Sequence, residues 1–149
     1  MELIYLDASA LNRVFDDQSQ SKIYLQSSAM IIIFQLIQEG MIEIASSDIL
    51  QFENSKNPYL ERKTFVNFIL SKAKLYQKIN EDILNRARQI KALGIKDLDA
   101  LHLASAEKLQ CTHFITCDER IIKRYNGQLA VMDPVDYIKN IMKGDKNGN

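Results

Sequence analysis

Hydrophobic and polar residues alternate along this chain in a way that predicts short strands separated by helices. Apolar runs that fit buried strands lie at residues 3–6, 42–45, 76–79, 113–116 and 129–132. Between them, apolar residues recur at helical spacing, which predicts helices at residues 7–15, 21–39, 47–56, 58–73, 80–93, 99–109 and 119–125, and a last one from residue 134. Strands joined through helices favour parallel pairing with right-handed crossovers. We therefore expect an α/β fold with a central parallel sheet.

Residues that begin or end helices support these boundaries. Gly40 and Gly94 close two of the expected helices, because glycine adopts without steric cost the left-handed conformation that ends a helix. Pro58 suits the first turn of the helix that it opens, since a first-turn residue needs no backbone N–H. Asn80 can cap the following helix with its side-chain oxygen.

The composition fits a single domain. The chain has 149 residues, of which 46% are hydrophobic, and we place the domain at residues 1–142 with a flexible tail at residues 143–149. No apolar run approaches the ~20 residues of a membrane helix, and the N-terminus begins with a strand pattern instead of a leader. We expect a cytoplasmic protein without membrane contact, in which Cys111 and Cys117 are reduced packing residues.

Four acidic residues occupy positions where an α/β fold brings side chains to one edge of the sheet. Asp7 and Asp118 follow the strand-like runs LIYL and FITC, Glu53 lies in the helix after the second strand, and Asp99 lies near the start of a helix. Ligands of open α/β sheets bind at the carboxyl ends of the strands. Carboxylates that converge repel one another unless a cation compensates them. The pattern therefore predicts a metal site with oxygen ligands, as Mg²⁺ or Mn²⁺ prefers.

The segments that carry these acids also resemble a known family. YLDASALNR, the helix with Glu53, IKDLDALHLASAE and FITCDERIIKR together resemble the PIN domain, and within it the VapC-type toxin ribonucleases. The resemblance implies a three-layer α/β/α fold and a cytoplasmic Mg²⁺- or Mn²⁺-dependent endoribonuclease, the toxin of a type II toxin-antitoxin pair. It also implies an antitoxin partner and a homodimer. By position, the residues that match the catalytic and metal-binding acids are Asp7, Glu53, Asp99 and Asp118, and Ser9 and Thr116 match the small hydroxyl positions beside the first and last.

The chemistry of these residues fits phosphodiester hydrolysis. In our interpretation Asp7 and Asp118 hold the principal metal ion, which makes a bound water more acidic and neutralises the phosphate. Asp99 and Glu53 then either bind a second ion or orient the attacking water. Ser9 and Thr116 are expected to hydrogen bond the carboxylates and fix their orientation. Whether one ion or two are bound stays open.

Each residue also has a structural interpretation. Asp7 and Asp118 can serve as helix N-caps, and Glu53 as a solvated helix residue. We expect His102 to be a satisfied imidazole on a helix surface. Asp97 lies two residues before Asp99, and we predict that Asp97 caps the helix whereas Asp99 binds metal.

The same residues also bear on other possible functions and partners. A haloacid-dehalogenase-like phosphatase needs D-x-D after its first strand, and Ser9 stands where the second acid is required. A housekeeping RNA-processing nuclease and a non-catalytic RNA- or protein-binding module remain alternatives.

The total charge is zero, with 19 basic and 19 acidic residues, but residues 62–91 hold eight basic and two acidic ones. We predict that this segment attracts RNA phosphates or an acidic antitoxin; the RNA target itself does not follow from the sequence.

Overall fold

Five parallel strands form the centre of the protein. The structure is a computed structural model that describes the backbone of residues 1–147 and the side chains of residues 1–144. The strands pair in the order β3-β2-β1-β4-β5, and every neighbouring pair is parallel. Their bounds are Leu3–Leu6 (β1), Glu43–Ser47 (β2), Leu75–Gln77 (β3), His113–Ile115 (β4) and Ala130–Met132 (β5). The predicted parallel sheet is confirmed.

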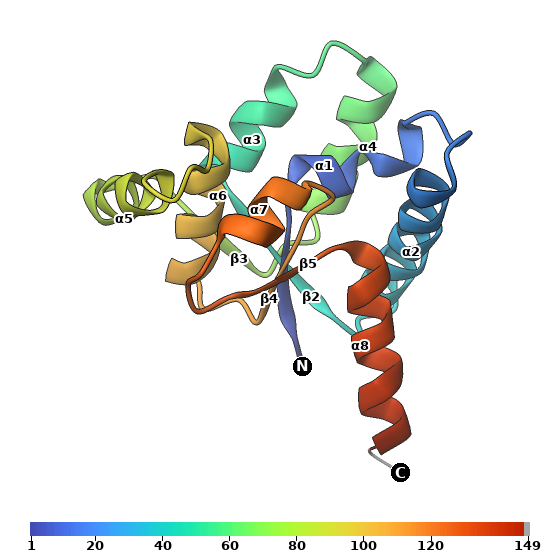
Figure 1. Cartoon of the computed structure of the whole chain (residues 1–149). Coiled ribbons are helices and arrows are strands. Elements are labelled where there is room, and N and C mark those ends of the chain that lie inside the picture. The colour runs from blue at the N-terminus through green and yellow to red at the C-terminus, as the bar shows by residue number, and fades with distance from the viewer. Residues whose placement is uncertain (148–149) are drawn as a thin grey trace.

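Helices cover both faces of this sheet. They are Ala8–Leu11 (α1), Ser21–Gln38 (α2), Asp48–Ser55 (α3), Leu60–Leu70 (α4), Glu81–Lys91 (α5), Asp97–Lys108 (α6), Glu119–Arg124 (α7) and Pro134–Asn147 (α8), with a short 3-10 helix at Arg13–Phe15. Helix α5 packs on α6 at one side of the sheet and α2 packs on α8 at the other (Figure 1). This is the three-layer α/β/α arrangement that the sequence predicted. Helices α1, α3 and α7 lie at the carboxyl ends of the strands (Figure 1).

The core is densest around β1, the middle strand. Ile4, Tyr5 and Leu6 are all buried, because helices cover both faces of a parallel sheet and leave neither face to water. The Tyr5 ring stacks on Phe114 of β4, with 5.2 Å between the ring centroids. The central strand is thus held rigidly up to its last residue, and Asp7 follows immediately.

The helix ends agree in part with the predicted boundaries. Gly40 and Gly94 have φ angles of 74° and 90°, the left-handed conformation expected of them, and the Asn80 side chain accepts a hydrogen bond from the Ile83 amide at 3.0 Å. The prediction that Pro58 opens α4 is wrong by two residues. The Asn57 side chain accepts a hydrogen bond from the Tyr59 amide at 3.0 Å, so this segment forms a turn and α4 begins at Leu60.

The C-terminal helix α8 continues to Asn147 and so includes part of the segment that we expected to be a tail. The last two residues of that segment, 148–149, lie outside the described residues. No described helix has the length and apolar character required to cross a membrane. Cys111 and Cys117 carry free thiols, and burial raises the pKa of each to about 12, as expected of packing residues.

Candidate functional site

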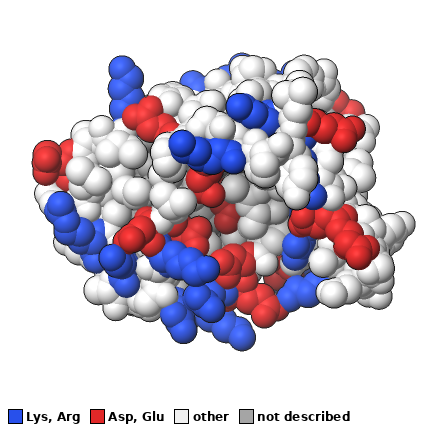
Figure 2. All heavy atoms as spheres, turned by 90° about the horizontal axis from the view of Figure 1, so that it is seen from above, with Lys and Arg blue, Asp and Glu red and all other residues white. Residues whose placement is uncertain are grey.

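The strand order brings the four acidic residues to one edge of the sheet. Asp7 directly follows the central strand β1, and β2 and β4 are its two neighbours. Glu53 lies on α3, which follows β2, and Asp118 precedes α7, which follows β4. These two acids therefore flank Asp7 from opposite sides. Figure 2 looks down on this edge and shows acidic side chains near its middle, with basic side chains around them.

Asp7 is the most enclosed of the four, with 3% of its surface exposed. Its Oδ1 accepts hydrogen bonds from the Ser9 hydroxyl at 2.7 Å and from the Ala10 amide at 3.0 Å, which caps α1. Burial raises the pKa of Asp7, and hydrogen bonds from Thr116 and Ser9 act in the opposite direction. The predicted N-cap is confirmed. Because a carboxylate offers about four lone-pair sites, capping leaves it able to bind a cation.

Two hydroxyl groups connect the first acid to the last. Ser9 Oγ lies 3.3 Å from Thr116 Oγ1 and accepts a hydrogen bond from the Cys117 amide at 2.9 Å. Thr116 Oγ1 in turn accepts the Asp118 amide at 3.0 Å. Asp118 caps α7 by accepting the amide of Arg120 at 2.9 Å. Ser9 and Thr116 thus join the segments after β1 and β4. Ser9 bonds the Asp7 carboxylate, as expected of it, whereas the bond of Thr116 to Asp118 is to the backbone amide.

Asp99 experiences the charges of all three other acids. Its pKa is raised from 3.8 to about 6, first by burial and then by Asp7, with further contributions from Asp118 and Glu53 and an opposing one from His102. The four carboxyl groups therefore share one electrostatic environment. Among the described residues, no three His, Cys, Asp or Glu side chains are already arranged as ligands of one ion. The acids converge without forming a complete coordination shell.

His102 contradicts our expectation of a surface imidazole. It is 1% exposed, because residues from β1 and α3 enclose it. Its Nδ1 lies 2.6 Å from the Tyr5 hydroxyl, which lies 2.6 Å from Ser47 Oγ, and its Nε2 contacts the Glu53 carboxylate. The sequence signal was the spacing of three residues from Asp99, which places both side chains on one side of α6. Tyr5 and Ser47 carried no such signal.

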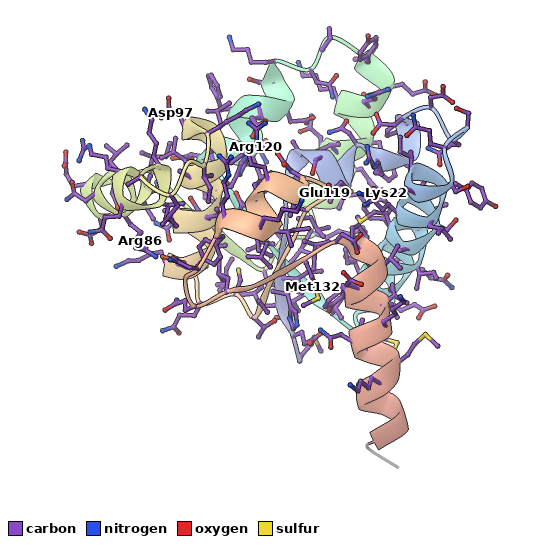
Figure 3. All side chains as sticks on the ribbon, viewed as in Figure 1. Lys22, Arg86, Asp97, Glu119, Arg120 and Met132 are labelled. Atoms are coloured by element: carbon purple, nitrogen blue, oxygen red, sulfur yellow. The ribbon has the colours of Figure 1, made fainter. Side chains whose placement is uncertain are left out.

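Asp97 does not cap α6, contrary to the prediction. The helix begins at Asp97 itself, with Lys96 in the cap position and without a side-chain capping bond. The Asp97 carboxylate pairs with the Lys91 ammonium at 2.8 Å and is mostly exposed. Figure 3 shows it at the outer start of α6. Asp97 is therefore exposed whereas Asp99 is partly buried, and the contact that Asp97 makes is an ion pair instead of a cap.

Basic residues border the acids on the side of Asp118. Lys96, Arg120, Lys123 and Arg124 line a groove with Asp118 and Glu119. Lys22 of α2 pairs with Glu119, and Figure 3 shows the two residues between α2 and α7, so the charge of this acid is compensated. Arg124 donates to the Gly94 carbonyl at 2.7 Å. The groove therefore presents positive charge directly beside a candidate metal ligand.

The basic segment at residues 62–91 does not form one such surface. Arg62 pairs with Asp16 and Arg86 with Glu107, so their charges are compensated. Lys72 and Lys74 line a depression at the amino ends of β2 and β3, at the opposite edge of the sheet from the acids. The sequence predicted a role for these lysines because basic residues are frequent in this segment. The direction of the strands, however, places them away from the candidate site.

Comparison with known proteins adds a family and a fold. The family model described as the PIN domain matches residues 4–127. One similar solved structure is that of VapBC2 from Rickettsia felis bound to a DNA fragment from its promoter. The matched chain is 15% identical to this one, and the TM-score is 0.56 over 88% of this chain and 98% of that chain. PAE2754 from Pyrobaculum aerophilum is also 15% identical, with a TM-score of 0.53 over 92% and 86%. A comparison with curated protein sequences gives no match. At 15% identity the structural likeness supports the fold alone.

Proposed function

This chain belongs to the PIN domain family, whose members are typically nucleases that use divalent metal ions, and we propose that it is a Mg²⁺- or Mn²⁺-dependent endoribonuclease. The observation that carries the proposal is the convergence of Asp7, Glu53, Asp99 and Asp118 at the carboxyl edge of the sheet, where Asp7, Asp118 and Glu53 raise the pKa of Asp99. Converging carboxylates repel one another and a bound cation would stabilise them, which favours a metal-dependent enzyme over a non-catalytic module.

The donor set fits a hard divalent cation. All four side chains offer carboxylate oxygens, the ligands that Mg²⁺ and Mn²⁺ take. Asp7 and Asp118 would hold the principal ion, and Glu53 and Asp99 would complete the site. When bound, the ion supplies a more acidic water and neutralises charge on the phosphate. Ser9 and Thr116 hold Asp7 and the Asp118 backbone in place, and the Glu53 carboxylate is held by His102.

The groove beside Asp118 supports a nucleic acid substrate. Lys96, Arg120 and Lys123 gather positive charge next to the acids, and a phosphate backbone is drawn to such a surface. A single strand can then pass from these cations across the carboxylates. The likeness of the site segments to VapC-type ribonucleases favours RNA as that strand.

We also propose a small antitoxin protein as partner, and a homodimer as the state of the chain. One structural neighbour is VapBC2, bound to DNA from its promoter. In this chain, α2 exposes a stripe of apolar side chains where a helix of a single domain normally shows polar ones. The exposed members of this stripe are Tyr24, Leu25, Ile31 and Ile32. A protein partner that covers the stripe would remove it from water.

The test is a cleavage assay on purified protein and single-stranded RNA. We expect cleavage with Mg²⁺ or Mn²⁺, none in excess EDTA, and recovery when metal is restored. Asp99→Asn should abolish cleavage, and Asp97→Asn, two residues away and exposed, should leave it intact. Cleavage that persists in EDTA, or a dead Asp97→Asn beside an active Asp99→Asn, would contradict the proposal. RNA binding without any cleavage would favour the non-catalytic module.

A further inference from the structure

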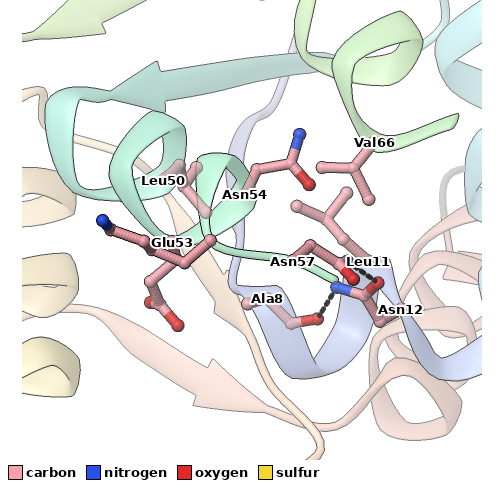
Figure 4. Close-up of a pocket in the computed structure, with 9 residues that line it drawn as sticks. Ala8, Leu11, Asn12, Leu50, Glu53, Asn54, Asn57 and Val66 are labelled. Atoms are coloured by element: carbon pink, nitrogen blue, oxygen red, sulfur yellow. Dashed lines mark hydrogen bonds between the residues drawn. The ribbon is translucent and has the colours of Figure 1, made fainter. Parts of the chain in front are cut away.

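A small pocket opens beside Glu53, on the opposite flank of the acids from the basic groove. Its volume is about 210 Å³, and its walls come from α1, α3, α4 and the turn after α3. Leu11, Leu50 and Val66 provide apolar surface. The polar lining consists of the side-chain amides of Asn12, Asn54 and Asn57 and the charged side chains of Glu53 and Lys56. Figure 4 shows these side chains around the pocket, with the Glu53 carboxylate directed to one side of it.

The pocket follows from the spacing of residues on α3. Leu50, Glu53, Asn54 and Asn57 stand at positions i, i+3, i+4 and i+7, which places them on one face of the helix and its extension. Any ligand in the pocket therefore contacts the same helical face that presents Glu53 to the other acids. The pocket and the candidate metal site are parts of one continuous surface.

Asn54 has a buried oxygen that accepts no hydrogen bond. The side chain is 6% exposed, and its Nδ2 donates to the Lys63 carbonyl at 3.1 Å and to Asn67 Oδ1 at 2.8 Å. These two bonds use both N–H groups and fix the orientation of the amide, because a flipped amide would lose both. Its Oδ1 is left without a donor among the described residues. A buried acceptor of this kind requires an explanation, and a ligand N–H is one.

Asn12 and Asn57 are held in place at the mouth of the pocket. The Asn57 Nδ2 donates to Asn12 Oδ1 at 3.2 Å, and Asn12 Nδ2 donates to the Ala8 carbonyl at 2.8 Å (Figure 4). The Asn57 oxygen accepts the Tyr59 amide at 3.0 Å. Each of these amide nitrogens keeps a second hydrogen for a ligand acceptor. The pocket thus combines apolar walls with a fixed acceptor and fixed donors.

We propose that this pocket binds one unstacked nucleobase of the RNA substrate, next to the phosphate that is cleaved. A nucleobase is a flat heterocycle with apolar faces and an edge of N–H donors and oxygen or nitrogen acceptors, which matches the walls and the amides. A cavity of about 150 Å³ accommodates a benzene ring, so about 210 Å³ admits a single base. Proteins that read single-stranded RNA hold splayed bases in this way.

The inference rests on the proposed ribonuclease function and deepens it, because it assigns sequence preference to α3. The strand would enter over Lys96, Arg120 and Lys123, place a phosphate at the four acids and insert the neighbouring base between α1 and α4. This order of contacts along the RNA follows from the sheet, since Asp118 after β4 and Glu53 after β2 lie on opposite sides of Asp7.

The experiment compares RNAs that differ only in one base. A series of oligonucleotides carries an abasic ribose at successive positions around the mapped cleavage site, and kcat/KM is measured with Mn²⁺. For the wild type we expect one position beside the cleaved bond at which removal of the base lowers kcat/KM by about tenfold or more, the order of loss seen when a base loses its protein platform. Elsewhere in the series the loss should be small.

Two pocket variants and one control complete the cycle. Asn54→Leu keeps the approximate shape of the side chain and removes the acceptor, and Asn57→Leu changes the mouth without touching the bonds of Asn54. Both should cleave the intact and the abasic RNA at similar rates. Asn85→Ala, on the outer surface of α5, should keep the wild-type difference. Melting temperatures identify a variant that fails to fold, and Asn57→Leu then carries the test.

The outcomes separate this inference from the proposed function. Cleavage that is indifferent to every abasic position, or a base dependence that both variants retain, overturns the pocket and leaves the nuclease standing. If no RNA is cleaved, the function fails, and the pocket is judged by the NMR signals of the Asn54 and Asn57 side-chain amides. A shift of these signals with intact RNA but not with abasic RNA supports base binding. A shift produced only by the antitoxin protein assigns the pocket to that partner and overturns the inference.

Discussion

The Glu53 carboxylate is held by a chain of hydrogen bonds that begins at the backbone of its own helix. The Leu50 amide donates to Ser47 Oγ at 3.1 Å, so we assign the Ser47 hydrogen to the Tyr5 oxygen. The Tyr5 hydroxyl then donates to His102 Nδ1, and Nε2–H of His102 donates to the Glu53 carboxylate. Each side-chain hydrogen in this assignment has an acceptor. His102 is therefore a positioning residue for Glu53.

We predict that His102→Gln weakens Mn²⁺ binding by about ten- to a hundredfold, the usual effect of losing a partner that orients a metal ligand. Calorimetric titration with Mn²⁺ measures this effect without reference to cleavage. In the cleavage assay kcat should fall and KM change little, because RNA contacts are untouched. Tyr5→Phe should give a smaller loss in the same direction. His113→Gln, at the other edge of the sheet, is the matched control, and equal Mn²⁺ affinity in His102→Gln and wild type would contradict the assignment.

Asp99 gives the metal-free protein a pH-dependent stability. Its pKa in the folded state, about 6, lies above the ordinary value of 3.8, so the folded protein binds its proton more tightly than the unfolded chain. Stability without metal should therefore fall as the pH rises from about 4 to about 6. Burial raises the pKa of Asp7 and acts in the same direction.

The corresponding variant is Asp99→Asn, measured by thermal unfolding in EDTA between pH 5 and pH 7. We expect its free energy of unfolding at pH 7 to exceed that of wild type by on the order of 1 kcal/mol. This is less than the full pKa shift implies, because Asp99 is only partly buried. Its melting temperature should also depend less on pH. Asp97→Asn loses an exposed ion pair worth about 0–1 kcal/mol and should keep the wild-type pH dependence. If Asp99→Asn and wild type follow the same pH profile, the acids do not share a site.

At the scale of elements, strand direction decides which cations can reach the site. Lys96 precedes α6 and Lys123 lies on α7, both beside Asp118, whereas Lys72 and Lys74 precede β3 at the amino edge of the sheet. The sequence alone does not distinguish one pair of lysines from the other. The fold places one pair next to the acids and the other pair at the far edge.

The two pairs should differ in the salt dependence of RNA binding. In an Asp99→Asn background, which prevents cleavage, Lys96→Ala with Lys123→Ala should lower the slope of log affinity against log salt by about 1.4, or about 0.7 for each lost phosphate contact to a single strand. Lys72→Ala with Lys74→Ala should leave the slope unchanged. Fluorescence anisotropy at several salt concentrations measures both. If only Lys72→Ala with Lys74→Ala lowered the slope, the prediction that residues 62–91 attract RNA would be supported instead.

For the molecule as a whole, α2 presents the surface that most requires a partner. Ile31 and Ile32 lie seven residues, or about two turns, after Tyr24 and Leu25, and all four are exposed although α2 packs its other side against α8. Burial of this stripe would be favourable at about 25 cal/mol for each Å² of apolar surface. The proposed antitoxin would cover this stripe and so remain bound to the chain.

We predict that Ile31→Lys with Ile32→Lys abolishes co-purification with a small protein encoded immediately upstream. RNA cleavage by the free chain should be unchanged, because Ile31 and Ile32 lie in the C-terminal half of α2, whereas Lys22 near its start is the residue that pairs with Glu119 beside Asp118. Met41→Lys alters an exposed apolar residue outside the stripe and should still co-purify. Light scattering on the same samples reports whether the chain is a dimer. A complex that survives the two lysines would place the partner elsewhere.

The sequence by itself determined the local elements and the order of the acids. The run at Leu3–Leu6 is apolar on both faces and so predicts a strand buried between two layers of helices, as β1 is. Gly94 and Asn80 mark helix ends because their conformational and capping preferences act within a few residues. These properties depend on covalent spacing, and the chain carries them without reference to distant parts.

Only the tertiary structure decided which distant residues meet. His102 is buried because Tyr5 and Glu53, 97 and 49 residues away, close around it. Asn67 and Lys63 accept both hydrogens of the Asn54 amide and so fix its orientation, in which no donor among the described residues meets its oxygen. Neither fact has a local signal, since a helical period says which way a side chain points and not what it meets. The strand order supplies those neighbours, and for that reason the acids were visible in the sequence whereas the contacts that position Glu53 and shape the pocket were not.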